Sequence, residues 1–162
     1  MTVEIILIQQ YTLFIGPGSY SLIVILLTLL LMSGIGSRFA GRIPVKAVFA
    51  AIVIWILLDI TLFTHLFYWL GALSMVPRAV ISALLIAPLG FFMGMPFPKG
   101  AMLAGELVDW GFAVNGAASV LGSVAIILIA VSFGFSIAML TGAALYICAY
   151  FLISGKAGWQ VK

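Results

Sequence analysis

Charged side chains are rare in this 162-residue chain, and their positions constrain its fold more than any other feature. The chain has seven lysines and arginines and four acidic residues. Nine of these eleven lie between long apolar runs or at the C-terminus. The other two are Glu4, in a short apolar segment, and Asp59, near the middle of a long one. The nine predict a membrane topology, and the two exceptions mark where function could lie.

The composition indicates that most of the surface faces lipid. Hydrophobic residues make up 65% of the chain and charged residues 7%, whereas a soluble globular chain carries about 25% charged residues. Its uncharged runs of about 20 residues are long enough to cross the hydrocarbon layer as helices. We therefore predict an all-α, polytopic helical membrane protein with a single membrane domain over residues 1–162.

The apolar runs predict five full transmembrane helices preceded by a half-helix. The half-helix covers residues 3–15, which reach only about 20 Å at 1.5 Å per residue, too short to span a bilayer. Gly16-Pro17-Gly18 ends it, because proline lacks an N–H donor and glycine permits a turn. The full spans are expected at about 20–35, 47–70, 79–95, 110–131 and 136–153.

The basic residues predict the orientation. The loop at 38–46 carries Arg38, Arg42 and Lys46. With this loop in the cytoplasm, the 96–109 segment and the C-terminal tail, with Lys156, Trp159 and Lys162, fall on the same side. Only Arg78 is then outside, which agrees with the excess of basic residues in cytoplasmic loops. We expect the bacterial cytoplasmic membrane as the location.

The segment at 99–110 is expected to be polar and to lie at the interface. Lys99, Glu106 and Asp109 are seven and three residues apart, a spacing that places them along one helical face.

Asp59 is the strongest candidate for chemistry. A carboxylate in the middle of the bilayer costs about 2.5–3.5 kcal/mol on insertion scales, so it should face protein or water. It could be a proton or ion site. The favoured alternative is a structural hydrogen bond to a neighbouring helix or partner subunit, because no second charged residue lies at that depth.

His65 is the second buried-polar candidate. It lies six positions after Asp59, about 240° around the helix, so the two share no face. A haem iron would need a second ligand from elsewhere, and an interfacial hydrogen bond is the favoured role for this histidine.

Small and polar residues form a seam in the run at 110–131. A four-residue repeat of this kind lets helices approach closely, so we expect helix packing here rather than a substrate site. The seam residues are Gly111, Asn115, Ser119, Gly122 and Ser123.

Several functional classes find no support. Gly34-Ile35-Gly36 follows no strand and lacks the full GxGxxG pattern, and GxSxG, HExxH and Walker A motifs do not occur. We expect no catalysis by this chain alone. We also expect no metal, quinone or haem and no nucleic-acid binding, since the basic residues lie in short loops. Bound lipid is expected. The single cysteine, Cys148, can form neither an internal disulfide nor a CxxC site.

The chain resembles the membrane-embedded region of bacterial spermidine-synthase-like proteins, also known as fused major-facilitator/spermidine synthase proteins. Three stretches carry the resemblance: residues 4–42 (EIILIQQYTLFIGPGSYSLIVILLTLLLMSGIGSRFAGR), 88–100 (PLGFFMGMPFPKG) and 110–135 (WGFAVNGAASVLGSVAIILIAVSFGF). It implies a six-segment bundle, as in one half of a major facilitator transporter. It also implies that residues 4–15 are the second half of a longer transmembrane helix. The aminopropyltransferase domain of that family is absent here, so no catalytic residue carries over.

Three functions follow as hypotheses. The favoured one is a non-catalytic integral membrane subunit that anchors or stabilises a larger complex. Its partner subunits would contact residues 1–18, where Glu4, Gln9 and Gln10 are costly against lipid. The alternatives are a major-facilitator-like transporter or half-transporter for a small cation or polyamine, and a membrane dock for a separate aminopropyltransferase-like enzyme.

Overall fold

A computed structural model of the chain describes residues 1–16 and 18–157, and every regular element within them is helical. The all-α prediction is therefore confirmed. The elements are α1 (Thr2–Ile15), α2 (Ser19–Arg38), α3 (Val45–Leu70), α4 (Met75–Met93), α5 (Pro96–Ala104), the 3-10 turn η1 (Gly105–Leu107), α6 (Val108–Phe133) and α7 (Phe135–Ala157). Pro17 and the tail residues Trp159 and Lys162 lie outside the described residues.

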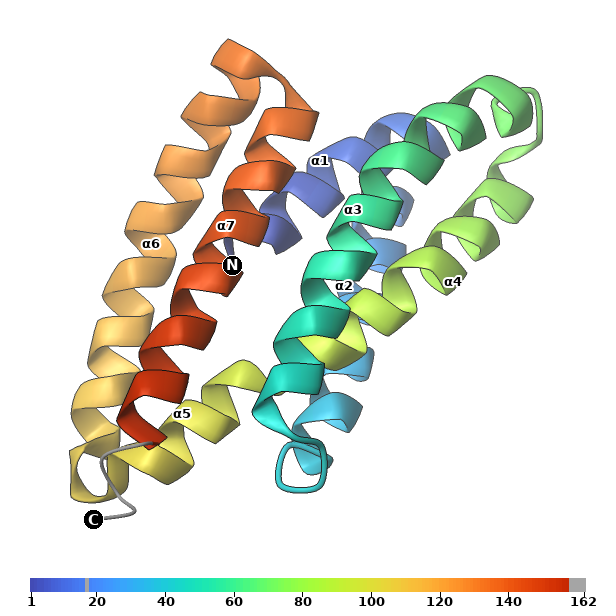
Figure 1. The fold of residues 1–162 in the computed structure, drawn as a ribbon. Helices are drawn as coiled ribbons and strands as arrows, with labels where there is room; N and C mark the ends of the chain where they lie inside the picture. The colour runs from blue at the N-terminus through green and yellow to red at the C-terminus, as the bar shows by residue number, and fades with distance from the viewer. Residues whose placement is uncertain (17, 158–162) are drawn as a thin grey trace.

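Four continuous apolar stretches in the described chain are long enough to cross a membrane: Ser19–Arg38, Val45–Phe63, Met75–Phe133 and Phe135–Gly155. The third has 59 residues, about three times the length of one span, and it contains α4, α5 and α6. Figure 1 shows that this stretch folds back at α5, which leaves α4 and α6 as separate rods. With 14 residues, α1 is shorter than a span.

The helices form two groups with α1 between them. α6 and α7 make a hairpin on one side, and α2, α3 and α4 pack together on the other (Figure 1). The 38–46 loop, α5 and the end of α7 lie at one end of the bundle, the lower end of Figure 1. The α3–α4 and α6–α7 turns lie at the opposite end. α1 begins about halfway along the bundle and runs toward that upper end.

Glycines bring α2 and α4 into the closest contact between two helices. A Cβ atom added to Gly36 would lie 1.9 Å from the carbonyl oxygen of Phe91, and one added to Gly94 would lie 2.1 Å from that of Ser33. Gly90, four residues before Gly94, faces Met32 across the same crossing. This is the small-xxx-small arrangement that lets helix backbones touch in membranes.

One side of α1 is buried in the bundle. The side chains of Val3, Ile6, Leu7, Tyr11, Phe14 and Ile15 are each at most 1% exposed. The helix ends at Gly16, whose φ of 127° is unfavourable for residues with a side chain. Arg78 of α4 secures this end, since its Nη1 donates to the carbonyl oxygen of Phe14 at 2.9 Å.

At the lower end of the bundle, the predicted shared face of Lys99, Glu106 and Asp109 is wrong. The three residues do not share a helical face, because α5 ends at Ala104 and η1 separates it from α6. The residue that follows α5, Gly105, has a φ of 55°. Glu106 and Asp109 are exposed, whereas Lys99 is buried. The Lys99 ammonium donates to the carbonyl oxygens of Ala40 and Ile43 and so ties α5 to the 38–46 loop.

Candidate functional site

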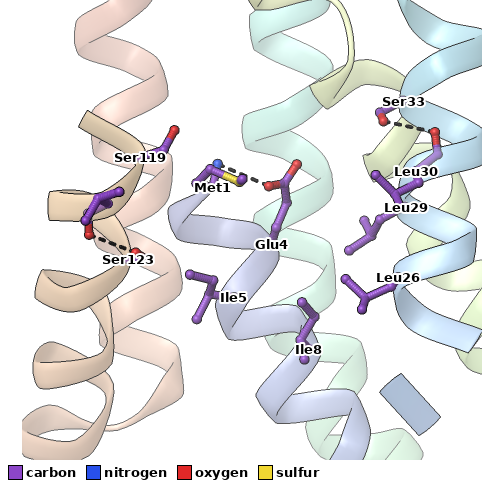
Figure 2. Close-up of a pocket in the computed structure, with 11 residues that line it drawn as sticks. Met1, Glu4, Ile5, Ile8, Leu26, Leu29, Leu30, Ser33, Ser119 and Ser123 are labelled. Carbon is purple, nitrogen blue, oxygen red and sulfur yellow. Dashed lines mark hydrogen bonds and ion pairs between the residues drawn. The ribbon is translucent and has the colours of Figure 1, made fainter. Parts of the chain in front are cut away.

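The outward face of α1 lies at the bottom of a groove between α2 and α6. Figure 2 shows the first half of this groove, with Met1 and Glu4 of α1 between the serines of α6 and the leucines of α2. This half has a volume of about 400 Å³. A second hollow of about 440 Å³ continues it toward the C-terminal end of α1, and Ile8 borders both. We call the two together the α1 groove.

The walls of the α1 groove are mostly apolar and come mainly from α1, α2 and α6, with Phe135 added by α7. Leu22, Leu26 and Leu30 recur every fourth residue along α2 and are all exposed. From α6 come Ser119, Val120, Ser123, Ala130 and Val131. The floor is made by Met1, which precedes α1, and by Glu4, Ile5, Ile8, Gln9, Thr12 and Leu13 of α1.

A third hollow adjoins the first turn of α1 on its inner side. We call it the end cavity; its volume is about 410 Å³ and its lining includes Phe97 of α5, Asn115 of α6 and Tyr146 of α7. Met1, Glu4 and Ser119 line both the α1 groove and the end cavity. Glu4 therefore has open space on two sides, in the α1 groove and in the end cavity.

Polar groups are few in the α1 groove. The Glu4 carboxylate is 3.2 Å from the N-terminal ammonium of Met1 and is 29% exposed. The hydroxyl groups of Ser33 and Ser123 donate within their own helices, to Leu30 at 3.2 Å and Val120 at 2.8 Å. The lining described here contains no lysine or arginine. The Glu4 carboxylate and the Met1 ammonium thus form an ion pair in an apolar groove whose other polar side chains are uncharged.

The first turn of α1 adds unmet backbone donors at this point. The first amide groups of a helix have no acceptor in the preceding turn, and no side chain caps α1 at Met1. Within a bilayer, where water is absent, each unsatisfied backbone group costs several kcal/mol. The first turn of α1 shares this lack of a side-chain cap with the first turns of α2 to α6.

The three residues predicted to contact a partner are placed differently. Glu4 and Gln9 both line the α1 groove. Gln10 is only 5% exposed and is not among the groove residues, and its Oε1 atom is buried without a hydrogen-bond partner. The outward face of α1 thus presents Glu4 and Gln9, while Gln10 belongs to the interior.

Asp59 has a partner that the sequence analysis missed. Its side chain is 4% exposed, and its Oδ1 accepts a hydrogen bond from the hydroxyl group of Tyr11 on α1. Its Oδ2 is buried without a partner. Tyr11 also packs edge-on against Phe63, with ring centroids 5.3 Å apart. The pair joins α1 to α3, and neither member lines the α1 groove or the end cavity.

His65 does not share the environment of Asp59. It lies six residues later on α3 and its side chain is exposed, whereas that of Asp59 is buried. Among the described residues, no group of three or more histidine, cysteine or acidic side chains is arranged to hold a metal ion.

The seam on α6 packs against α1 only in part. A Cβ atom on Gly122 would lie 3.0 Å from Cγ2 of Thr2, so α6 approaches α1 there. Ser119 and Ser123 line the α1 groove. Gly111 has no neighbouring atom within 4 Å of its added Cβ, and Asn115 is exposed beside the end cavity. The seam is therefore mainly a wall of these cavities.

No protein-family model, no curated protein and no solved structure matches this chain. The resemblance to the membrane region of spermidine-synthase-like proteins stays a prediction.

Proposed function

We propose that this protein is a non-catalytic integral membrane subunit that anchors or stabilises a larger membrane complex. In this proposal a transmembrane helix of a partner subunit lies in the α1 groove and reaches the end cavity. The observation that carries the proposal is the position of Glu4 and Gln9, two polar side chains on the outward face of a helix that is too short to span.

The cost of leaving this face against lipid supports the proposal. Acidic residues within a membrane segment pair with other groups or face protein or water. A partner helix with a basic or hydrogen-bonding side chain would meet Glu4. Its backbone carbonyls or polar side chains would also lie near the uncapped first turn of α1. Apolar side chains would then fill the space between Leu26 of α2 and Val120 of α6.

Membrane location and orientation belong to the same proposal. We place the protein in a bacterial cytoplasmic membrane with the 38–46 loop and the end of α7 in the cytoplasm. The basic residues Arg38, Arg42 and Lys46 support this orientation, and Arg78 at the opposite end is the exception.

The transporter alternative rests in part on Asp59, and the contacts of Asp59 favour a structural role. Its carboxylate accepts a hydrogen bond from Tyr11 and borders neither the α1 groove nor the end cavity. An ion or proton pathway needs a carboxylate that water or substrate can reach. The third hypothesis, a membrane dock for an aminopropyltransferase-like enzyme, rests on the family resemblance and would use the same cytoplasmic end.

Gentle extraction from the native membrane tests the proposal. We expect the wild-type protein to elute as a complex with a defined membrane partner. Glu4→Lys should release the partner, because it reverses the charge in the groove. Glu106→Lys is the matched control, since Glu106 is exposed outside the groove. A wild-type protein that elutes alone, or a partner that resists Glu4→Lys, would contradict the proposal. Uptake into proteoliposomes that Asp59→Asn abolishes would favour the transporter instead.

A further inference from the structure

A second groove, distinct from the α1 groove, lies on the surface between α3 and α7. Its volume is about 330 Å³, within the range of small-molecule sites. Its lining from α3 is Lys46, Phe49, Ala50, Val53 and Ile54, and its lining from α7 is Ile147, Tyr150 and Phe151. On each helix these residues are spaced three and four apart, so that each presents one continuous face to the groove.

The groove is apolar along its length and has a cation at one end. Lys46 lies in the first turn of α3, at the end of the bundle that carries the 38–46 loop (Figure 1). Its side chain is exposed, and it has no ion-pair or hydrogen-bond partner in the described part of the chain. The other lining side chains carry no charge. The one free charge is therefore at the interfacial end, and the apolar walls extend from it toward the middle of the bundle.

The dimensions of the groove match one leaflet of a bilayer. Eight residues separate Lys46 from Ile54, which is about 12 Å along a helix. Half of the hydrocarbon thickness is about 15 Å. A groove of this length takes most of an acyl chain that enters from the interface.

The floor of the groove is preformed by aromatic packing. Phe49 is 3% exposed, and its ring lies 6.2 Å from that of Tyr146 and 6.0 Å from that of Tyr150. These contacts join α3 to α7 beneath the groove. The walls, by contrast, are formed by exposed side chains such as Ile54 and Phe151. An acyl chain would thus bind to a surface that is already ordered.

We infer that this groove is a binding site for an anionic phospholipid. One acyl chain lies between α3 and α7, and the headgroup phosphate pairs with the Lys46 ammonium. The combination of a free cation at the interface and an apolar groove about one leaflet deep is complementary to that class of ligand. The site is independent of the α1 groove, so this inference does not depend on the proposed partner.

Native mass spectrometry of the protein exchanged with defined lipids tests the inference. The probes are phosphatidylglycerol and phosphatidylcholine with the same acyl chains. We expect one tightly retained phosphatidylglycerol and a preference for it over phosphatidylcholine. Lys46→Gln should weaken retention of phosphatidylglycerol by about fivefold, since one basic residue near an anionic surface contributes about that factor. Arg38→Gln is the matched control and should retain the lipid.

A second variant tests the apolar part of the groove. Ile54→Trp fills the space between the helices, whereas Leu57→Trp enlarges a side chain of α3 that is exposed outside the groove. Only Ile54→Trp should lose the retained lipid, with both variants eluting at the size of the wild type. Equal retention of the two lipids by the wild type would overturn the inference. The inference would also be overturned if Lys46→Gln retained phosphatidylglycerol as tightly as the wild type. The same holds if Ile54→Trp and Leu57→Trp lost the lipid to the same extent.

Discussion

The pairing of Asp59 with Tyr11 shows how this bundle accommodates a buried acid. The carboxylate lies in α3 and the hydroxyl in α1, 48 residues apart in the chain. Loss of a buried hydrogen bond leaves the remaining partner unsatisfied, which costs about 1–3 kcal/mol. The pair therefore fixes the short α1 helix against α3. Arg78 similarly fixes the C-terminal end of α1, because its guanidinium donates a hydrogen bond to the carbonyl oxygen of Phe14.

Replacing Tyr11 by phenylalanine should destabilise the bundle by about 2 kcal/mol, because a buried group without a partner costs about 1–3 kcal/mol. Thermal unfolding in detergent measures this loss of stability as a lower unfolding temperature. Tyr20→Phe makes the same chemical change at a side chain that is 73% exposed, and it should melt like the wild type. Adding Asp59→Leu to Tyr11→Phe should restore part of the loss, since replacing both partners is often nearly neutral. Equal melting of the two tyrosine variants would contradict the structural role of the pair.

Replacing Arg78 by methionine should also lower the unfolding temperature. The change removes a charge-assisted hydrogen bond to the last turn of α1, for which about 1.5–3 kcal/mol is typical. Arg38→Met, at an exposed arginine, is the comparison. If both variants melted at the same temperature, Arg78 would not be securing α1.

At the scale of the helices, the closest packing is where α2 crosses α4. Gly36 and Gly94 each face a backbone carbonyl of the other helix, and a backbone cannot move aside as a flexible side chain can. The crossing is therefore specified by the lack of a side chain at these two positions.

Gly94→Ala should force α2 and α4 apart and destabilise the protein by several kcal/mol, in the range of overpacked cores or above. Gly116→Ala in α6 is the matched control, because no atom lies within 4 Å of its added Cβ. This control should be neutral or slightly stabilising, since alanine favours helix by about 1 kcal/mol over glycine. Thermal unfolding distinguishes them, and a Gly94→Ala variant as stable as Gly116→Ala would refute the tight crossing.

Much of the helical layout could be predicted from the sequence, because it depends on local composition. Apolar length and the glycine and proline breaks placed the helices within about four residues of α2, α3, α4, α6 and α7. The contacts between helices could not be predicted in this way. A small-residue repeat on α6 was visible, yet the closest approach uses Gly36 and Gly94, which only the fold brings together. Tyr11 was missed as the partner of Asp59 for the same reason.

Lys99 shows a further limit of spacing arguments. Its seven-residue separation from Glu106 suggested a shared face, but a spacing rule holds only within one continuous helix. Gly105 takes a positive φ and interrupts the helix between them. Glu4 and Gln9 could likewise be recognised from the sequence as polar residues of a short helix. The groove beside them could not be predicted, because it depends on where α2 and α6 lie relative to α1.

The whole molecule has its basic loop and α5 at one end and its two tight helical turns at the other (Figure 1). Lys99 reinforces the lower end by bonding to the loop at Ala40 and Ile43. This asymmetry is what the orientation proposal rests on.

Cysteine labelling tests that orientation. In a Cys148→Ser background, Gly41→Cys should react with a membrane-impermeant maleimide only after the cells are opened. Leu73→Cys, in the α3–α4 turn, should react in intact cells. The reverse pattern would place the basic loop outside and overturn the orientation.

The central claim for the whole molecule is that a partner helix occupies the α1 groove. Photocrosslinking in native membranes tests it most directly, with the reactive group placed at neighbouring positions on the same helices. Leu26 and Val120 line the groove, whereas Leu27 and Leu121 are exposed but are not among its lining residues. We expect Leu26 and Val120 to give one adduct with the same transmembrane segment of the same protein, and Leu27 and Leu121 to give none. Adducts of equal yield at all four positions, or adducts with lipid alone at Leu26 and Val120, would contradict the claim.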